Sequence, residues 1–203
     1  RNFVCLEIGS GIGAGIVVQG GILRGAGGMG GEVGHMPVDP AGPVCACGCK
    51  GCWEVFCSGP AIRRNLAHKL AETANASAAL GPLVTLAELH AAYLQGDTVA
   101  NAVVEEWAAC FVRGLIGVIW NFDPEFILLT GPVVSQCPSL AEAAKRIIGG
   151  LKGNARSFDV PLILESHHAG TGVVAASATV ATRYLEELAS GGSHRETRLL
   201  AAQ

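Results

Sequence analysis

The hydrophobic pattern of this chain changes character along its length. In the first quarter, apolar residues stand in short runs separated by glycines, as in strands joined by tight turns. Later they recur every three or four residues, the spacing that places apolar side chains on one face of a helix. Strands followed by helices that alternate with single strands indicate an α/β fold. Strands are predicted at residues 3–8, 14–19, 22–24, 126–129 and 160–164. Helices are predicted at residues 61–73, 85–94, 97–122, 139–151 and 171–188.

Composition and charge narrow the classes of protein to which the chain can belong. Half of the 203 residues (50%) are hydrophobic and 15% are charged, which excludes a chain that is disordered over most of its length. The formal net charge is -3 and no basic stripe is visible, so we expect this chain to bind no nucleic acid. No apolar run reaches the roughly 18 residues of a membrane span, so we expect no membrane partner.

The domain organisation is simple. No internal repeat interrupts the pattern, and we expect one domain over residues 1–189 with a flexible tail over residues 190–203. The chain starts at Arg1 rather than at a methionine and carries no signal peptide. We therefore expect it to be part of a longer protein.

A cluster of cysteines is the most specific chemical feature. Five of the eight cysteines follow one another closely: Cys45, Cys47, Cys49, Cys52 and Cys57. Clustering inside an apolar domain favours a reducing compartment, the cytoplasm, and a bound metal over a secreted disulfide framework. Three thiolates with the imidazole of His35 would fill a closed, tetrahedral zinc site. The spacing alone does not select which cysteines bind, and a redox or disulfide loop is the alternative.

The turn Gly9-Ser10-Gly11-Ile12-Gly13 is a candidate phosphate-binding loop. It stands between two predicted strands, so it fits neither the dinucleotide fingerprint nor the P-loop. Three glycines in a hairpin turn can still point several backbone N–H groups at a phosphate, with the Ser10 hydroxyl as a further donor. A plain tight turn is the alternative interpretation.

Two glutamates flank the cysteine cluster. A metal that drew residues 35 and 52 together would also bring Glu32 and Glu54 near each other. Two carboxylates and the imidazole of His35 are suited to a polyhydroxylated ligand, because each oxygen can accept a hydrogen bond from a hydroxyl. The alternative is that each glutamate is a solvated surface group. The pair His167-His168 has no neighbouring acid, and we interpret it as the end of a strand.

These motifs together resemble the ROK family, which contains bacterial sugar kinases and sugar-responsive repressors. The resemblance implies an actin-like (ribonuclease H-like) ATPase or sugar-kinase lobe with an inserted zinc loop, residues 35–52. It also implies His35, Cys45, Cys47 and Cys52 as the ligands of a structural zinc ion, and leaves Cys49 as an extra thiol. The motifs are Gly9-Ser10-Gly11-Ile12-Gly13, Gly31-Glu32-Val33-Gly34-His35 and Cys45-Ala46-Cys47-Gly48-Cys49-Lys50-Gly51-Cys52-Trp53-Glu54.

The resemblance implies roles for other residues as well. Glu32, His35 and Glu54 would contact the hydroxyls of a hexose or N-acetylhexosamine. The complete kinase would use ATP and Mg²⁺, and no residue of this chain matches the family's catalytic Asn-Asp pair. We therefore expect the first lobe to lie outside this chain, and the chain alone to show little or no kinase turnover. The residues implied in nucleotide binding are Gly9, Ser10, Gly11, Gly13 and Gly131.

Three functions follow from the resemblance. The first is the C-terminal portion of an ATP-dependent sugar kinase of the glucokinase or N-acylhexosamine kinase type. The second is the sugar-sensing portion of a ROK transcriptional repressor, with its DNA-binding domain upstream. The third is a truncated domain that zinc stabilises and that has no activity. The low charge content and the small residues of the predicted helix 171–188 favour a homodimer.

Overall fold

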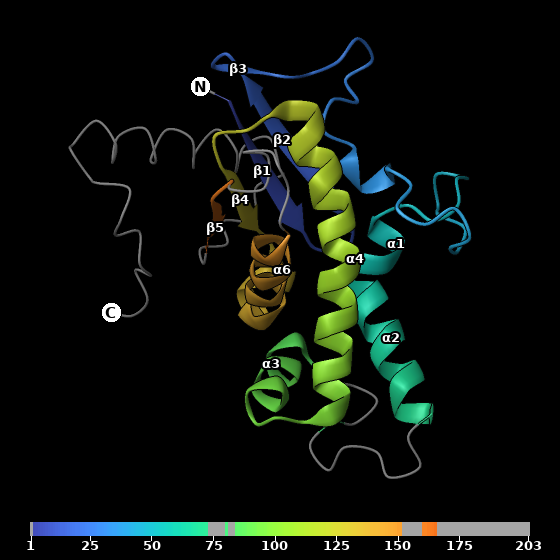
Figure 1. Ribbon diagram of the computed structural model, residues 1–203. Helices are drawn as coiled ribbons and strands as arrows, with labels where there is room; N and C mark the ends of the chain where they lie inside the picture. Colours follow the sequence, from blue (N-terminus) through green and yellow to red (C-terminus); the bar gives the residue numbers. More distant parts are fainter. Residues whose placement is uncertain (1, 73–79, 81–83, 152–159, 166–203) are drawn as a thin grey trace, which may run out of the picture.

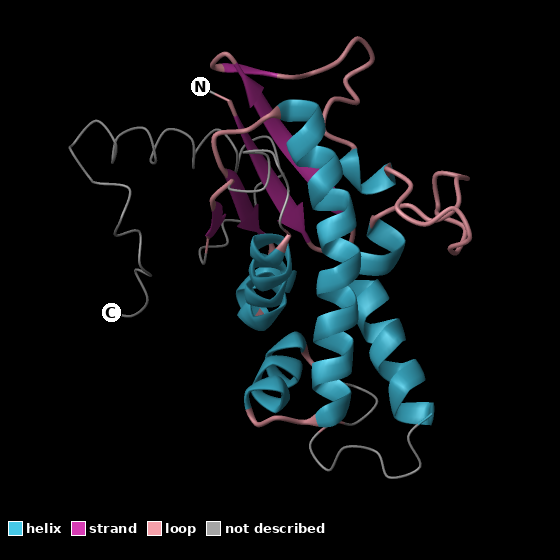
Figure 2. Ribbon diagram, in the orientation of Figure 1, coloured by secondary structure: helices cyan, strands magenta, loops and turns pink. Residues whose placement is uncertain are grey.

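The computed structural model describes residues 2–72, 80, 84–151 and 160–165 (Figures 1 and 2). Within these residues the strands are β1 Phe3–Ile8, β2 Ile12–Val18, β3 Gly21–Ile22, β4 Ile127–Thr130 and β5 Leu162–Leu164. They form one sheet in the order β3-β2-β1-β4-β5. β2 is antiparallel to both β1 and β3, whereas β4 is parallel to both β1 and β5. The carboxyl ends of β1 and β4 therefore lie at the same edge of the sheet.

Helices cover one side of this sheet and extend beyond it (Figure 1). The described helical segments are η1 Val33–His35, α1 Glu54–Cys57, α2 Gly59–Glu72, α3 Leu86–Leu94, α4 Thr98–Phe122, α5 Pro132–Gln136 and α6 Pro138–Gly150. α4 is the longest and packs against α2, α3 and α6. Figure 2 shows the sheet beside one end of α4, with α2 running alongside that helix. No helix in this part of the chain is both long enough and apolar enough to span a membrane.

Local sequence explains where the main helices begin. Thr85 caps α3 with a complete capping box, because its side chain accepts from the backbone N–H of Glu88 and the Glu88 carboxylate accepts from the backbone N–H of Thr85. The Asp97 side chain accepts from the first free N–H groups of α4, those of Val99 and Ala100. These caps satisfy backbone donors that have no partner within the helix.

The core lies between the sheet and α4. Alternate residues of β1, Val4, Leu6 and Ile8, are buried in it. On α4 the rings of Trp107 and Phe111 stack with their centroids 4.4 Å apart. A smaller hydrophobic cluster lies on the other face of the sheet. In this cluster the ring of Phe3 stacks on that of Phe126. Glu7 follows Phe3 and Cys5 in the alternation of β1, so it lies on this second face.

The pattern of elements follows the sequence prediction with local differences. The turn after β1 is shorter than expected, because Ile12 already pairs with Ile8 in the antiparallel ladder. Strand β3 is Gly21–Ile22 rather than residues 22–24. The short segments η1, α1 and α5 were not predicted. Three predictions lie outside the described residues: the helix 171–188, the His167-His168 segment and the tail 190–203.

Candidate functional site

The segment from η1 to α1 brings together four side chains that could bind a metal ion. One ligand atom of each residue lies within 4.8 Å of one from every other, and the residues are His35, Cys45, Cys47 and Cys52. The Cys47 and Cys52 sulfurs are 3.6 Å apart, and His35 Nδ1 lies 3.5 Å from the Cys45 sulfur. Cys49 is not part of the cluster. Three thiols and one imidazole suit a soft divalent ion such as zinc.

Backbone hydrogen bonds fold the loop so that the sulfurs converge. The N–H of Cys45 donates to the carbonyl of Cys49 at 2.7 Å, and the N–H of Gly48 donates to the carbonyl of Cys45 at 2.9 Å. Gly51 has φ of +66° and packs so closely on Asp39 that a Cβ atom would overlap the Asp39 carbonyl. This close approach requires glycine beside the buried Cys52.

The thiols of the cluster differ in acidity. A backbone hydrogen bond from Cys49, together with the Cys52 and Cys45 side chains, lowers the pKa of Cys47 to about 7. Burial raises the pKa of Cys52 to about 12, and the neighbouring Cys47 and Cys45 thiols add to that effect. A cation at the centre would favour the thiolate form of all three sulfurs, which is the form that binds metal.

Both predicted glutamates lie against the same imidazole. Glu32 Oε2 is 3.8 Å from His35 Nε2, and Glu54 Oε1 is 3.5 Å from His35 Nδ1. The Glu54 carboxylate also accepts from the Cys45 thiol at 3.1 Å. The side chain of Glu32 is 56% exposed and that of Glu54 is 21% exposed. The carboxylates of Glu32 and Glu54 therefore lie beside the His35 imidazole, at the edge of the group of one histidine and three cysteines.

The glycine turn lies next to this group. Oxygen Oε2 of Glu54 is 2.8 Å from the point that a Cβ atom of Gly11 would occupy. A hydrogen bond connects the turn to α2, because the N–H of Gly59 at the start of this helix donates to the carbonyl of Gly9 at 2.7 Å. Ser10, at the tip, is exposed. The candidate phosphate loop and the candidate sugar acid are therefore neighbours.

Gly131 approaches the same turn from β4. A Cβ atom on Gly131 would overlap the backbone of Ile8, and a Cβ atom on Gly9 would lie 3.5 Å from the Pro132 ring. Gly13 pairs with Glu7 in the β1–β2 ladder. All five residues that the resemblance implies in nucleotide binding thus gather at one edge of the sheet, at the carboxyl ends of β1 and β4.

The sequence analysis did not single out Glu7. Its atom Oε2 is buried and has no hydrogen-bond partner. A single charged residue within an otherwise apolar strand was the available signal, but the missing partner is visible only in the structure.

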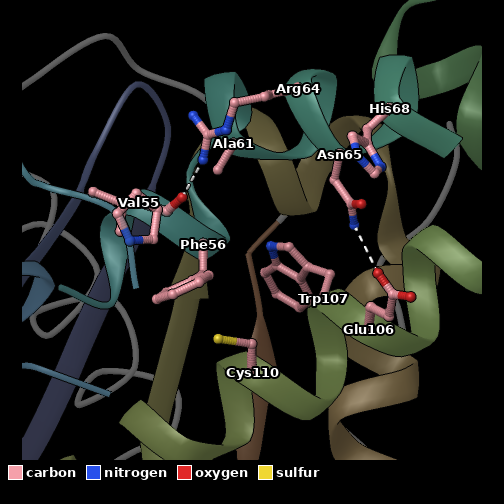
Figure 3. A pocket seen from close by; sticks show the side chains of 10 residues that line it. Val55, Phe56, Ala61, Arg64, Asn65, His68, Glu106, Trp107 and Cys110 are labelled. Carbon is pink, nitrogen blue, oxygen red and sulfur yellow. Dashed lines mark hydrogen bonds between the residues drawn. The ribbon is translucent and has the colours of Figure 1, made fainter. Parts of the chain in front are cut away.

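A separate cavity of about 370 Å³ lies between α1, α2 and α4 (Figure 3). Trp107 forms its floor with Phe56 and Cys110, and at its rim Asn65 donates to the Glu106 carboxylate at 3.2 Å. None of the residues predicted to bind metal, sugar or phosphate lines this cavity.

The chain matches a known protein family over most of its length. A family model described as the ROK family matches residues 1–183. The chain belongs to the ROK family. The resemblance stated from the motifs is thereby confirmed.

Curated ROK relatives include kinases and repressors. The chain is 31% identical over 171 residues to the glucokinase of Thermotoga maritima, covering 79% of this chain and 50% of that protein. It is 27% identical over 145 residues to the xylose repressor of Bacillus spizizenii, covering 71% of this chain and 35% of the repressor. N-acetylmannosamine kinases are also among its relatives. The chain spans about half the length of the kinases that it matches.

Solved structures agree with this assignment. A ROK glucokinase from Streptomyces griseus, in complex with glucose and AMPPNP, superposes with a TM-score of 0.73 at 26% identity. The alignment covers 88% of this chain and 60% of that enzyme. The α/β fold described above is therefore consistent with that of solved ROK family structures.

Proposed function

We propose that this chain is the C-terminal portion of an ATP-dependent sugar kinase. In this proposal Glu32, His35 and Glu54 bind the hydroxyls of a hexose or N-acetylhexosamine, and a structural zinc ion holds them in position. The zinc ligands would be His35, Cys45, Cys47 and Cys52.

One observation carries the proposal. The four possible zinc ligands converge to within 4.8 Å, and the two carboxylates lie 3.8 and 3.5 Å from the nitrogens of the same imidazole. Glutamates that served solubility alone would have no reason to lie against both nitrogens of one candidate metal ligand, His35. The partly buried Glu54 carboxylate offers a fixed acceptor, and sugar hydroxyls are the donors that match it.

The glycine turn would supply the nucleotide end of the site. Its closeness to Glu54 fits phosphoryl transfer, in which the sugar and the terminal phosphate must meet. Backbone N–H groups and the Ser10 hydroxyl would hold phosphate oxygens, with Gly131 close to the same turn. Mg²⁺, when bound with ATP, neutralises charge on the phosphates.

The test is calorimetric titration of the zinc-loaded chain with glucose, N-acetylmannosamine and N-acetylglucosamine. We expect one of these sugars to bind, and Glu54→Gln to weaken its binding about ten- to a hundredfold, the effect of losing a hydrogen bond to a charged group. The matched control is Glu72→Gln, which removes the same charge from an exposed side chain on α2. Absence of binding to all three sugars by the zinc-loaded chain would refute the proposal.

A sugar-sensing portion of a ROK repressor is the second candidate, because the xylose repressor aligns over 71% of this chain. Both candidates predict zinc and sugar binding. Coding DNA upstream of Arg1 separates them, since an Asn-Asp pair favours the kinase and a basic helix-turn-helix favours the repressor.

A further inference from the structure

Two cysteines outside the candidate metal site meet where α1 packs against α4. Cys57 is the last residue of α1 and is buried, and Cys110 lies on α4 and is partly buried. Both have free thiols, and neither belongs to the group of one histidine and three cysteines that could bind a metal ion. The proposed function gives neither thiol a role.

Trp107 fixes the position of Cys57 against α4. The indole N–H of Trp107 donates to the backbone carbonyl of Cys57 at 2.9 Å, and the Cys57 thiol donates to the backbone carbonyl of Trp107 at 3.9 Å. A carbonyl of an α-helix points along the axis toward the residues three and four positions later. The Cys57 sulfur therefore lies at the level of Cys110, and a side-chain hydrogen bond links the two cysteines.

The two thiols differ in their access to solvent. Cys110 lines the cavity of about 370 Å³ between α1, α2 and α4, together with Phe56 and Trp107 (Figure 3). Cys57 is not one of the residues that line this cavity, and it is 0% exposed. A small reagent that enters the cavity can therefore reach the Cys110 sulfur, whereas the Cys57 sulfur can be reached through Cys110.

The acidity of the two thiols favours the same order of reaction. The hydrogen bond with Cys57 lowers the pKa of the Cys110 thiol, and the Arg113 guanidinium acts in the same direction. Burial raises the pKa of the Cys57 thiol well above its usual value. The thiolate is the nucleophile in thiol–disulfide exchange, so Cys110 is the thiol that attacks first.

Trp53 provides a donor for the second thiol. Its indole N–H is buried and has no hydrogen-bond partner. A Cys57 thiolate would accept from this N–H, which lowers the pKa of Cys57 against the larger effect of burial. In its protonated form Cys57 donates to the Trp107 carbonyl instead. Cys57 thus has a hydrogen-bond partner in either protonation state.

We propose that Cys110 and Cys57 form a thiol–disulfide exchange site, which low-molecular-weight disulfides oxidise to a reversible covalent link between α1 and α4. The Cys110 thiolate attacks one sulfur of the reagent R–S–S–R, the S–S bond of the reagent breaks, and the departing RS⁻ takes up a proton. The Cys57 thiolate then attacks the Cys110 sulfur of the mixed disulfide and releases the second RS⁻, which is protonated in turn.

The reaction balances without any further reactant. The two cysteines together lose two electrons and two protons, and the reagent disulfide is reduced to two thiols. An excess of a dithiol reverses the reaction. No sugar, nucleotide or metal ion takes part, so the proposal stands apart from the proposed function.

The experiment treats the purified chain with oxidised glutathione at pH 8 and maps every cysteine by mass spectrometry over time. We expect a mixed disulfide at Cys110 first and a disulfide between Cys57 and Cys110 afterwards. Cys137 is the internal control, because it is also buried and burial raises its pKa to about 12. The Cys110 thiol should react at least about tenfold faster than that of Cys137, which is almost never ionised at this pH.

Substitutions separate the roles of the two thiols. Cys57→Ser should leave Cys110 reactive and retain the mixed disulfide, because the thiol that displaces glutathione is absent. Cys110→Ser should slow the loss of the Cys57 thiol at least about tenfold, because the reagent no longer has an accessible sulfur to attack. Cys57→Ala repeats the first test without placing a hydroxyl in the core. The order of the two products on the unaltered chain requires no variant.

Zinc provides a second readout. On the zinc-loaded chain a chromophoric chelator reports any metal that is released during oxidation. The link between Cys57 and Cys110 should form while the metal stays bound, because neither cysteine belongs to the candidate ligand set. A link that forms only after the metal has left would overturn the proposal, since it would show that the loop must first open.

Other results would also overturn the proposal. One is a Cys110 thiol that stays unmodified while the exposed Cys49 thiol reacts. Another is a mixed disulfide at Cys110 that persists in the unaltered chain, which would show that the Cys57 sulfur cannot reach it. A third is equal loss of the Cys57 thiol with and without Cys110. None of these results bears on sugar binding, and absence of sugar binding leaves the role of these two thiols unaffected.

Discussion

Gly51 offers a sharp test of how the candidate zinc loop, residues 35–52, is built. Its backbone makes three hydrogen bonds: its N–H donates to Pro43 at 2.8 Å, and its carbonyl accepts from Val38 at 2.9 Å and from Asp39 at 3.3 Å. A Cβ atom at Gly51 would overlap the Asp39 carbonyl. Gly51→Ala therefore forces the backbone beside Cys52 to move, and some of these hydrogen bonds must break.

Gly48 provides the matched control within the same loop. It also has a positive φ, +90°, but a Cβ atom there would meet nothing within 4 Å. Gly48→Ala should cost only the backbone strain of a left-handed residue, about 1–2 kcal/mol. Gly51→Ala adds the loss of about two hydrogen bonds, each worth about 1 kcal/mol, for a total of about 3–4 kcal/mol.

Zinc affinity should report this difference, because metal binding and folding of the loop are coupled. The excess of about 2 kcal/mol predicts zinc binding about thirtyfold weaker in Gly51→Ala than in Gly48→Ala. Competition with a chromophoric chelator at fixed pH measures both constants. Equal zinc affinities in the two variants would show that the contact between Gly51 and Asp39 does not shape the site.

Three further predictions concern protons and stability. Zinc binding should release about two protons at pH 8 and about three at pH 6, because the Cys47 thiol, with a pKa of about 7, is mostly ionised only at the higher pH. Calorimetry in buffers of different ionisation enthalpy counts the released protons. A proton release that does not depend on pH would contradict the assignment of these cysteines as ligands. Thr85→Ala should lower the free energy of unfolding by about 1 kcal/mol through loss of the α3 cap; an unchanged urea midpoint would count against that cap. Phe111→Ala should cost about 3–5 kcal/mol, since its fully buried ring stacks on Trp107; a cost below about 1 kcal/mol would mean that the core repacks.

Much of the fold is encoded in local patterns that the sequence displays. The apolar spacing of residues 97–122 continues through seven turns of helix, so α4 was predicted within one residue of its observed bounds, Thr98–Phe122. The capping box of α3 also depends on a local pattern, Thr85 with Glu88 three residues later. α1, with four residues, and η1, with three, are about one turn or shorter and leave no periodicity to detect.

For the candidate site, too, some features can be predicted from local sequence and others depend on tertiary structure. The spacing of His35 and the cysteines indicated a metal without selecting among the cysteines. The family resemblance left Cys49 out of the ligand set, and the structure brings the side chains of the other four residues together. Glu7 illustrates a different limit. A sequence reveals that a residue is charged, whereas the absence of a partner for its oxygen depends on every segment packed around it.

X-ray absorption at the zinc edge, combined with metal analysis of the purified chain, addresses the identity of the site most directly. We expect one zinc ion per chain, with three sulfurs at about 2.3 Å and one nitrogen at about 2.0–2.1 Å. Four sulfurs would place Cys49 in the ligand set and remove His35 from it, which would separate the metal from Glu32 and Glu54. That result, or purified chain without stoichiometric zinc, would contradict a zinc-supported sugar site.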